Sequence, residues 1–390
     1  MNVLIRGALL IPGDGGAPRP DTDVRVEAAR IAEIGSGLAV LPSDRLVVEA
    51  RGRVLMPAFV DAHTHALWAG DRLDEFAQRL AGKSYVEILK AGGGILSTVR
   101  AVRAASEAEL AEGLAERLER MLREGSATVE VKSGYGLSTE HELKMLRAIA
   151  IAAQRFSGTV VPTALLGHAL DPEQPNFVER VISETLPAVH EEFPGIFVDA
   201  FCEEGAWSLA DCARLLRRAA ELGHPCRLHA DQFQRLGALE LSVELGLVSV
   251  DHLEASTPSD LERLARSSTF GVVLPVSGLH LDGRYANVRP FLDAGGRLVL
   301  ASNCNPGSAP SSSMPLVIAL AVRHCGVLLD EALKATTYNP AQLLSLTDRG
   351  CIAPGQRADL MLLRHRDVRQ LGYELGGNPV EWVMVAGAVV

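Results

Sequence analysis

The chain has 390 residues, of which 47% are hydrophobic and 22% are charged, which is enough for one large globular domain and a smaller one. Its formal net charge of -10 and its aromatic content of 5% argue against a nucleic-acid-binding surface, because such surfaces combine clustered Lys and Arg with stacking aromatic rings. We therefore expect a small-molecule substrate and no nucleic-acid partner.

The cysteine pattern and the hydrophobic pattern point to one compartment. The six cysteines form no C-x-x-C pair, and a chain of this length folds without disulfide bonds, so we expect reduced thiols. No apolar run approaches the roughly 20 residues that a membrane helix needs. The first residues are typical of a strand and a turn and not of a signal peptide. These features predict a cytoplasmic protein with no membrane partner.

Both ends of the chain alternate short apolar segments with turns. Gly, Pro and Asp separate the segments at the spacing typical of a small antiparallel sheet. The segments cover residues 3–11, 24–34 and 46–49 at one end, and residues 359–363 and 381–390 at the other. We expect the two ends, residues 1–56 and 350–390, to pair into one discontinuous β domain, separate from residues 57–349.

The middle of the chain repeats a strand, a loop and a helix. The first strand candidate covers residues 54–60, an apolar run rich in β-forming residues. Seven more strand candidates end at residues 132–136, 165–168, 201–204, 228–231, 250–253, 273–275 and 300–303. Eight strands that alternate with helices over about 290 residues are typical of an α/β fold of the (β/α)8 class, whose active site lies at the carboxyl ends of the strands.

Helix starts and glycine patterns favour this barrel over its alternative. Capping boxes are expected from Ser106 and from Thr139, and Thr257 precedes a proline at the first helical position. A doubly wound open sheet is the alternative architecture, but no G-x-G-x-x-G opens a helix. The three glycines at 92–94 lack a Walker lysine, so we expect a flexible lid there and not a phosphate cradle.

His63 and His65 follow the first strand candidate. Residues two apart on a strand project to the same face, so both imidazoles can converge on one ion. Two surface histidines at a strand edge are the alternative, but His229, His252 and Asn303 end the fifth, sixth and eighth strand candidates. Three neutral imidazoles with an open position form a common catalytic zinc site. The pattern therefore predicts a metal site.

Three more polar positions lie near the strand ends. Asp61 either orients a ligating imidazole or caps a neighbouring helix. Arg72, in the loop after the first strand, either binds a substrate carboxylate bidentately or is only solvated. His168 ends the third strand candidate, above the expected mouth, and is kept as a site candidate. Four other histidines fall in predicted helices or loops and are expected to be structural, namely His190, His224, His280 and His324.

Several longer motifs carry a family resemblance. They are Phe-Val-Asp-Ala-His-Thr-His at 59–65, Gly-Asp-Arg at 70–72, Ala-Gly-Gly-Gly-Ile-Leu-Ser-Thr-Val-Arg at 91–100, Lys-Ser-Gly-Tyr-Gly-Leu at 132–137, Leu-His-Ala-Asp-Gln at 228–232, Asp-His-Leu at 251–253 and Asn-Pro-Gly-Ser at 305–308. Together they resemble the imidazolonepropionases of histidine degradation, a family of the amidohydrolase superfamily. The resemblance runs along essentially the whole chain.

The resemblance implies a TIM-like (β/α)8 barrel with a discontinuous β-sandwich built from both termini. It implies one divalent metal, zinc or iron, with ligands at His63, His65, His229 and position 303. It also implies substrate contacts, which are Arg72, Tyr135, His168 and Gln232 for imidazolone propionate, and Asn305, Gly307 and Ser308 for the formimidoyl-glutamate end. In the same family pattern, His252 would polarise the attacked carbonyl or steady the attacking water.

Asn303 departs from the family pattern, which has an aspartate there that ligates the metal and accepts a proton from water. An amide oxygen can coordinate a cation, but it is uncharged and accepts no proton at neutral pH. The other proton acceptors expected near the mouth are His252, Asp231 and the pair Glu203 and Glu204. We favour His252, because an unperturbed imidazole titrates near neutrality.

The expected function is metal-dependent hydrolysis of the cyclic amide of 4-imidazolone-5-propanoate to N-formimidoyl-L-glutamate, impaired if Asn303 removes the general base. One alternative is an aminohydrolase that acts on a heterocyclic amine, and another is a catalytically silent relative that only binds the ligand. No lysine on the fourth strand candidate is available to bridge two ions, which favours a single metal. A homodimer is the expected assembly.

Overall fold

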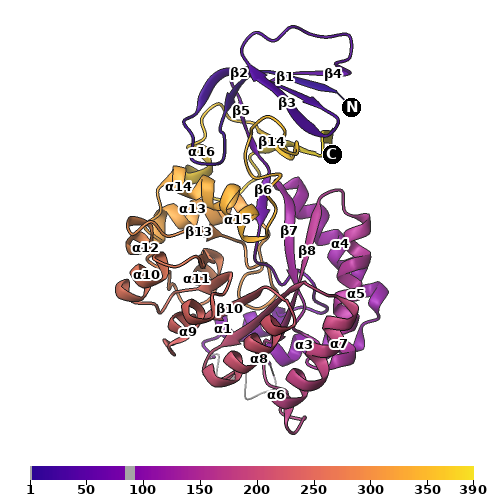
Figure 1. Ribbon diagram of the computed structural model, residues 1–390, viewed down its shortest axis with the longest axis vertical. Helices are drawn as coiled ribbons and strands as arrows, with labels where there is room; N and C mark the ends of the chain where they lie inside the picture. Colours follow the sequence, from indigo (N-terminus) through magenta and orange to yellow (C-terminus); the bar gives the residue numbers. More distant parts are fainter. Residues whose placement is uncertain (1, 84–92) are drawn as a thin grey trace.

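The computed structural model describes residues 2–83 and 93–390. Two eight-stranded sheets organise the chain. In Figure 1 the sheet that holds both termini lies at the upper end, and the second sheet, with its helices, forms the larger body below. The expected lid begins at Gly92, which lies outside the described residues.

The larger sheet is a parallel barrel whose strands follow chain order. They are β6 (Phe59–Asp61), β7 (Ser126–Lys132), β8 (Thr159–Gly167), β9 (Phe197–Cys202), β10 (Cys226–Ala230), β11 (Ser249–His252), β12 (Phe270–Val273) and β13 (Leu298–Leu300). Each strand pairs in parallel with the next. Near-continuous apolar runs suit strands that are buried on both faces. The (β/α)8 barrel expected from the sequence is confirmed.

Helices connect or follow the barrel strands, one lies between two strands of the terminal sheet, and most lie around the outside of the barrel (Figure 1). They are α1 (Leu73–Leu80), α3 (Ile95–Ala104), α4 (Glu107–Arg123), α5 (Thr139–Arg155), α6 (Phe177–Arg180), the π-helical turn η1 (Val181–Thr185), α7 (Leu186–Glu192), α8 (Leu209–Glu221), α9 (Ala238–Leu245), α10 (Pro258–Ala265), α11 (Pro275–His280), α12 (Arg289–Asp293), α13 (Met314–His324), α14 (Leu329–Thr336), α15 (Tyr338–Leu343) and α16 (Gln370–Tyr373). In α4, for example, Leu110, Leu114 and Leu118 recur every fourth residue and are buried.

Two of the three expected helix starts are confirmed. Ser106 caps α4 and Thr257 caps α10, each in a capping box. The third expectation is wrong, because Ser138 and not Thr139 caps α5. The carboxylate of Glu142, expected in that capping box, instead accepts N–H groups of the loop before the helix.

The terminal sheet contains strands from both ends of the chain. They are β1 (Val3–Leu10), β2 (Arg19–Glu27), β3 (Arg30–Gly35), β4 (Leu46–Glu49), β5 (Val54–Pro57), β14 (Leu360–Leu363), β15 (Val380–Val385) and β16 (Ala388–Val389). Their order is β16-β15-β14-β5-β1-β2-β3, with β4 beside β1. The expectation of an antiparallel sheet is wrong in part, since β4 and β5 both pair in parallel with β1. The sheet buries an apolar core of its own, which includes Ile5 and Leu360.

The expectation of one continuous strand over residues 54–60 is wrong. Val54–Pro57 forms β5 and pairs with β14, whereas Phe59–Asp61 forms β6 and pairs with β7 in the barrel. Both strands are apolar and fully buried, so their hydrophobic pattern does not reveal the change of sheet. The sequence does mark the change with Pro57, which cannot donate a hydrogen bond to a continuing ladder.

The barrel closes through contacts just beyond its first and last strands. Asp61, at the end of β6, accepts hydrogen bonds from the N–H of Ser302 at 3.0 Å and from its hydroxyl at 2.5 Å. The N–H of Asn303 donates to the carbonyl of His63 at 3.0 Å. Both interpretations of Asp61, as an imidazole orienter or as a helix cap, are therefore wrong. Its carboxylate ties the first barrel strand to the segment after the last.

All six cysteines are free thiols. Burial raises the pKa of Cys226, Cys304 and Cys325 to about 12, so these three thiols stay protonated. Within residues 2–83 and 93–390, no helix has the length and apolar character that crossing a membrane requires.

Candidate metal centre at the barrel mouth

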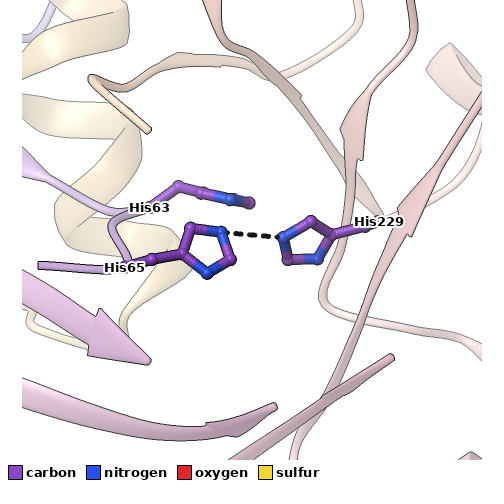
Figure 2. Close-up of side chains that lie close together, drawn as sticks. All are labelled: His63, His65 and His229. Carbon is purple, nitrogen blue, oxygen red and sulfur yellow. Dashed lines mark hydrogen bonds between the residues drawn. The ribbon is translucent and has the colours of Figure 1, made fainter. Parts of the chain in front are cut away.

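Three histidines meet at the carboxyl ends of the barrel strands (Figure 2). His63 and His65 lie in the segment after β6, and His229 lies on β10. The Nε2 atoms of His65 and His229 are 3.3 Å apart, and the ring centroids of His63 and His229 are 4.5 Å apart. One ring nitrogen from each histidine lies within 4.8 Å of the others. The structure thus brings together the three imidazoles that the strand pattern singles out.

Two buried carboxylates hold the Nδ1 atoms of two of these three rings. Nδ1 of His63 donates to Oδ2 of Asp251 at 2.6 Å, and Nδ1 of His229 donates to Oδ1 of Asp199 at 3.2 Å. Such partners fix the tautomer and the orientation of a ligating imidazole. Sequence reasoning missed both carboxylates. The available signals were a lone charge inside the apolar strand β9 and an aspartate directly before the histidine that ends β11.

Buried cations pair with these carboxylates. Arg227 donates to Asp251 at 2.7 Å, and Lys132 donates to Asp199 at 2.9 Å and to Glu130 at 2.7 Å. All five side chains are 0% exposed. Unpaired charges at this depth would be strongly destabilising. The ion pairs therefore offset the cost of burying these charged groups beneath the histidines.

The three imidazoles are neutral. Burial, helped by nearby positive groups, lowers the pKa of His63 and of His65 well below the usual value, and burial also lowers the pKa of His229. Because Nδ1 of His63 and of His229 donates to a carboxylate, Nε2 of each ring carries the lone pair. A neutral imidazole nitrogen is the form that ligates a metal.

Asn303 lies against the segment that carries His63, because its N–H donates to the carbonyl of His63 at 3.0 Å. Its Nδ2 donates to Oγ of Ser277 at 2.8 Å, which leaves Oδ1 as a buried acceptor without a partner among the described residues. Nε2 of His63 is likewise buried without a partner there. Unsatisfied buried acceptors are costly, and a cation would satisfy them. Three imidazole nitrogens and one amide oxygen fit a divalent metal.

His252 ends β11 beside the three histidines. Its ring centroid lies 5.6 Å from that of His229 and 6.1 Å from that of His63. Its Nδ1 lies 3.3 Å from Oε1 of Glu254, a partner that sequence reasoning missed. Gln232, after β10, is also buried, and its side chain makes no hydrogen bond to another described residue.

Tyr135 and His168 form an aromatic wall beside His65. The rings of His65 and His168 stack with centroids 5.0 Å apart, and Tyr135 lies 5.1 Å from His168. Nδ1 of His168 donates to the carbonyl of Gly134 at 2.9 Å. Burial lowers the pKa of His168 to about 3, so its ring is neutral and its Nε2 is a hydrogen-bond acceptor.

Arg72 lies at the start of α1 and is partly engaged. Its Nε donates to Oγ1 of Thr98 at 2.9 Å, and its Nη1 pairs with Glu75 at 2.6 Å. Its Nη2 donates to no group among the described residues. A Cβ added to Gly307 would lie 3.7 Å from that Nη2, so the turn at Gly307 approaches the guanidinium closely.

Asn305 uses its side chain inside its own turn. Its Oδ1 accepts the N–H groups of Gly307 at 2.8 Å and Ser308 at 2.7 Å. Its Nδ2 donates to the carbonyl of Asn303 at 2.6 Å and to the hydroxyl of Ser308 at 2.9 Å. This side chain shapes the loop that follows Asn303.

Two of the carboxylates considered as alternative bases, Glu203 and Asp231, accept hydrogen bonds from backbone or hydroxyl groups. Glu203 accepts the N–H groups of Phe233 at 2.9 Å and Gln234 at 3.3 Å. Asp231 accepts the hydroxyl of Ser256 at 2.9 Å, and burial raises its pKa to about 6. No ring contact or hydrogen bond among the described residues joins Glu203 or Asp231 to the three histidines.

Known proteins are similar in sequence to this chain along most of its length. The model of the amidohydrolase family matches residues 54–390. An imidazolonepropionase of Herpetosiphon aurantiacus is 44% identical over 382 residues, which cover 94% of this chain and 89% of the relative. An imidazolonepropionase of Chloroflexus aggregans is 42% identical over 95% of this chain and 91% of the relative.

Solved structures share the fold at lower identity. A 5-methylcytosine deaminase from Klebsiella pneumoniae has a TM-score of 0.75 at 17% identity, covering 99% of this chain and 97% of that chain. An N-isopropylammelide isopropylaminohydrolase from Burkholderia multivorans has a TM-score of 0.74 at 18% identity, covering 100% of this chain and 98% of that chain. These two likenesses show the fold alone. By its sequence matches, the chain belongs to the amidohydrolase family, among the imidazolonepropionases.

Proposed function

We propose that this chain hydrolyses the cyclic amide of 4-imidazolone-5-propanoate to N-formimidoyl-L-glutamate in histidine degradation. The observation that carries the proposal is the set of unsatisfied lone pairs on His63 and Asn303 beside His65 and His229. The names of relatives at 42–44% identity support the substrate.

His63, His65, His229 and Asn303 would hold one zinc or iron ion. When bound, such an ion polarises a carbonyl oxygen and makes water a better nucleophile near neutral pH. The protein prepares the site with neutral rings, of which those of His63 and His229 are oriented by buried carboxylates.

The substrate lies between Arg72 and the aromatic wall. Nη2 of Arg72 donates to the propionate carboxylate, a charge-assisted hydrogen bond. Nε2 of His168 accepts an N–H of the imidazolone ring, and Tyr135 packs beside that ring. Gln232 and the turn of Asn305, Gly307 and Ser308 line the rest of the substrate site. Holding both ends of the substrate fixes the ring carbonyl in position for attack.

His252 moves the proton in the reaction. Glu254 accepts its Nδ1–H, so Nε2 is free to take a proton from the attacking water. The new carbon–oxygen bond forms and the carbon–nitrogen bond of the imidazolone ring breaks. The protonated imidazole of His252 then gives its proton to the departing nitrogen of the substrate. Asn303 cannot take this role, because a neutral amide does not accept a proton near neutral pH.

The test is hydrolysis of imidazolone propionate by metal-loaded wild type and by an Asn303→Asp variant. A restored carboxylate adds a second proton acceptor, so we expect turnover by both proteins and a kcat about 10²-fold to 10⁴-fold higher in the variant. Asn176→Asp is the control, because Asn176 is exposed and has a similar backbone φ of 55° against 54° for Asn303.

Two outcomes would contradict the proposed function, and a third would contradict the gain expected from a carboxylate at position 303. If neither wild type nor the Asn303→Asp variant hydrolyses imidazolone propionate, the substrate assignment is wrong. Release of ammonia from a heterocyclic amine such as cytosine, without turnover of imidazolone propionate, makes the chain an aminohydrolase. Equal kcat values for wild type and variant show that position 303 has no part in the proton transfer.

A further inference from the structure

The loop of residues 133–137 after β7, here called the Tyr135 loop, supplies two features of the proposed substrate site. It carries Tyr135, whose ring lies 5.1 Å from that of His168. It also carries the carbonyl of Gly134, which accepts Nδ1–H of His168 at 2.9 Å and so sets which nitrogen of that ring faces the substrate. Any change in the shape of this loop moves both features together.

The N–H groups of the Tyr135 loop converge on a single buried carboxylate. Glu142 on α5 accepts hydrogen bonds from Gly134 at 2.9 Å, Gly136 at 2.8 Å and Leu137 at 2.9 Å. The side chain is 3% exposed. Charge-assisted hydrogen bonds of this kind are about twice as strong as neutral ones. Glu142 therefore holds the loop from its donor side.

The carbonyl groups of the same loop are held by cationic and amide side chains from outside it. Arg103 on α3 donates to the carbonyls of Gly136 at 2.8 Å and Leu137 at 3.0 Å. Asp171 pairs with that guanidinium at 2.7 Å, and Gln174 donates to the carbonyl of Leu137 at 3.1 Å. Three side chains from three segments, Glu142, Arg103 and Gln174, thus hold one five-residue loop on its donor and acceptor sides, and Asp171 holds the guanidinium of Arg103.

The loop backbone needs this support. Gly134 has φ 110° and Leu137 has φ 50°, and a non-glycine residue in the left-handed region is unfavourable on its own. The loop also packs closely. A Cβ added to Gly134 would lie 2.9 Å from Nδ1 of His168, and one added to Gly136 would lie 2.6 Å from the N of Glu142.

We infer that Glu142 is a positioning residue for substrate binding, which acts by holding the loop that carries Tyr135 and the carbonyl partner of His168. This inference rests on the proposed function, since Tyr135 and His168 are substrate contacts only if that function holds. Glu142 touches neither substrate nor metal. Its loss therefore weakens substrate binding more than it slows the chemical step.

The first experiment compares Glu142→Gln with wild type in hydrolysis of imidazolone propionate and in binding of imidazole-4-propionate. A glutamine keeps one acceptor oxygen but places an NH2 group against N–H donors. We expect KM and the Kd for imidazole-4-propionate to rise about tenfold while kcat changes much less. Glu140→Gln is the matched control, because Glu140 is an exposed acid in the first turn of the same helix.

A second variant tests the loop from its acceptor side. Arg103→Met removes the donors to Gly136 and Leu137 from a partly exposed position, so it gives folded protein even if Glu142→Gln does not. The same rise in KM and Kd is expected. In the double variant of Glu142→Gln with Tyr135→Phe, the two effects on Kd should be less than additive, because both act through Tyr135.

The outcomes separate this inference from the proposed function. The positioning role alone is overturned if wild type binds and hydrolyses the substrate while Glu142→Gln and Arg103→Met leave KM and Kd unchanged. Additive effects of the Glu142 and Tyr135 substitutions also overturn it. Wild type that neither binds imidazole-4-propionate nor hydrolyses imidazolone propionate removes the proposed function and the inference with it.

Discussion

Asp251 holds the ring of His63, one of the proposed metal ligands. Its carboxylate accepts Nδ1–H of His63 at 2.6 Å and a donor of Arg227 at 2.7 Å, and all three side chains are buried. The negative charge makes the lone pair on Nε2 of His63 a stronger ligand for a metal, and the hydrogen bond fixes the plane of the ring. In the proposed metal site, the affinity for the ion would therefore depend on Asp251 as well as on the histidine that it holds.

The Asp251→Asn variant should bind zinc about 10-fold to 100-fold more weakly than wild type. The amide oxygen can still accept Nδ1–H of His63, but the charge is lost and Arg227 is left without its carboxylate. Competition with a chelator measures the affinity on protein confirmed as folded by circular dichroism. Asp260→Asn is the control, since Asp260 is also buried and paired with an arginine, Arg235, but contacts no histidine. Unchanged zinc affinity in Asp251→Asn would contradict the role of this carboxylate.

At the scale of single residues, the sequence predicted the histidines but not their hydrogen-bond partners. His63 and His65 could be placed together because alternate residues of an extended chain share a face, and His229 because it ends a later strand. Asp199 and Asp251 could not be assigned in the same way. Their partners lie on other strands, and no local period of the sequence encodes which side chains meet across a barrel. The mistaken role for Asp61 has the same cause.

At the scale of helices and strands, the sequence fails where two environments look alike. Both β5 and β6 are buried apolar strands, so the pattern over residues 54–60 could not reveal that they belong to different sheets. Ser138 and Thr139 are both good helix caps, and Glu142 stands at the capping-box spacing from the second. The choice between them depends on the Tyr135 loop, which takes the carboxylate.

A histidine pair links α7 to the turn after α8. Nδ1 of His224 donates to the carbonyl of Ile196 at 2.8 Å, and Nε2 of His224 accepts Nδ1–H of His190 at 3.1 Å. Burial lowers the pKa of His224 below its usual value, and the neighbouring His190 adds to this effect. A proton on Nε2 of His224 would break the link to His190. The neutral form of His224 is thus the form that stabilises the fold.

We expect acid to weaken this link. Because the pKa of His224 is lower in the folded state than the roughly 6.5 of the unfolded chain, its contribution to stability is fully present above about pH 6.5 and is lost as pH falls through the folded pKa. The urea midpoint of wild type should therefore fall more steeply between about pH 7.5 and pH 5 than that of a His224→Gln variant. Parallel pH dependences of the two proteins would contradict this assignment.

At the scale of the whole molecule, Gly125 lies where the barrel meets the terminal sheet. Its carbonyl accepts the N–H of Phe59 on β6 at 2.8 Å. A Cβ added to Gly125 would lie 2.9 Å from both Sδ of Met361 on β14 and Cδ2 of Phe59, and its φ of 104° disfavours any side chain. The absence of a side chain at Gly125 therefore lets Met361 of the terminal sheet and Phe59 of the barrel lie close to this position.

The Gly125→Ala variant should lower the free energy of unfolding by about 1–3 kcal/mol, through backbone strain and crowding at the junction. Urea unfolding measures the change. Gly205→Ala is the control, because Gly205 has a φ of 84° but nothing within 4 Å of an added Cβ. A loss of stability in Gly125→Ala no larger than in Gly205→Ala would contradict the role of close packing at this junction.

The contacts that close the barrel also decide when the site can exist during synthesis of the chain. Asp61 and Ser302, which tie the first strand to the segment after the last, are 241 residues apart in sequence. The strands β5 and β14, which are neighbours in the terminal sheet, are even further apart in sequence. Contacts between such distant residues form late in folding. His63 and His65 leave the ribosome early, but until Asn303 and Cys304 follow, the segment that carries them has no partner on that side. In a nascent or truncated chain, therefore, His63 and His65 form an open pair, and the proposed metal centre is complete only in the finished barrel.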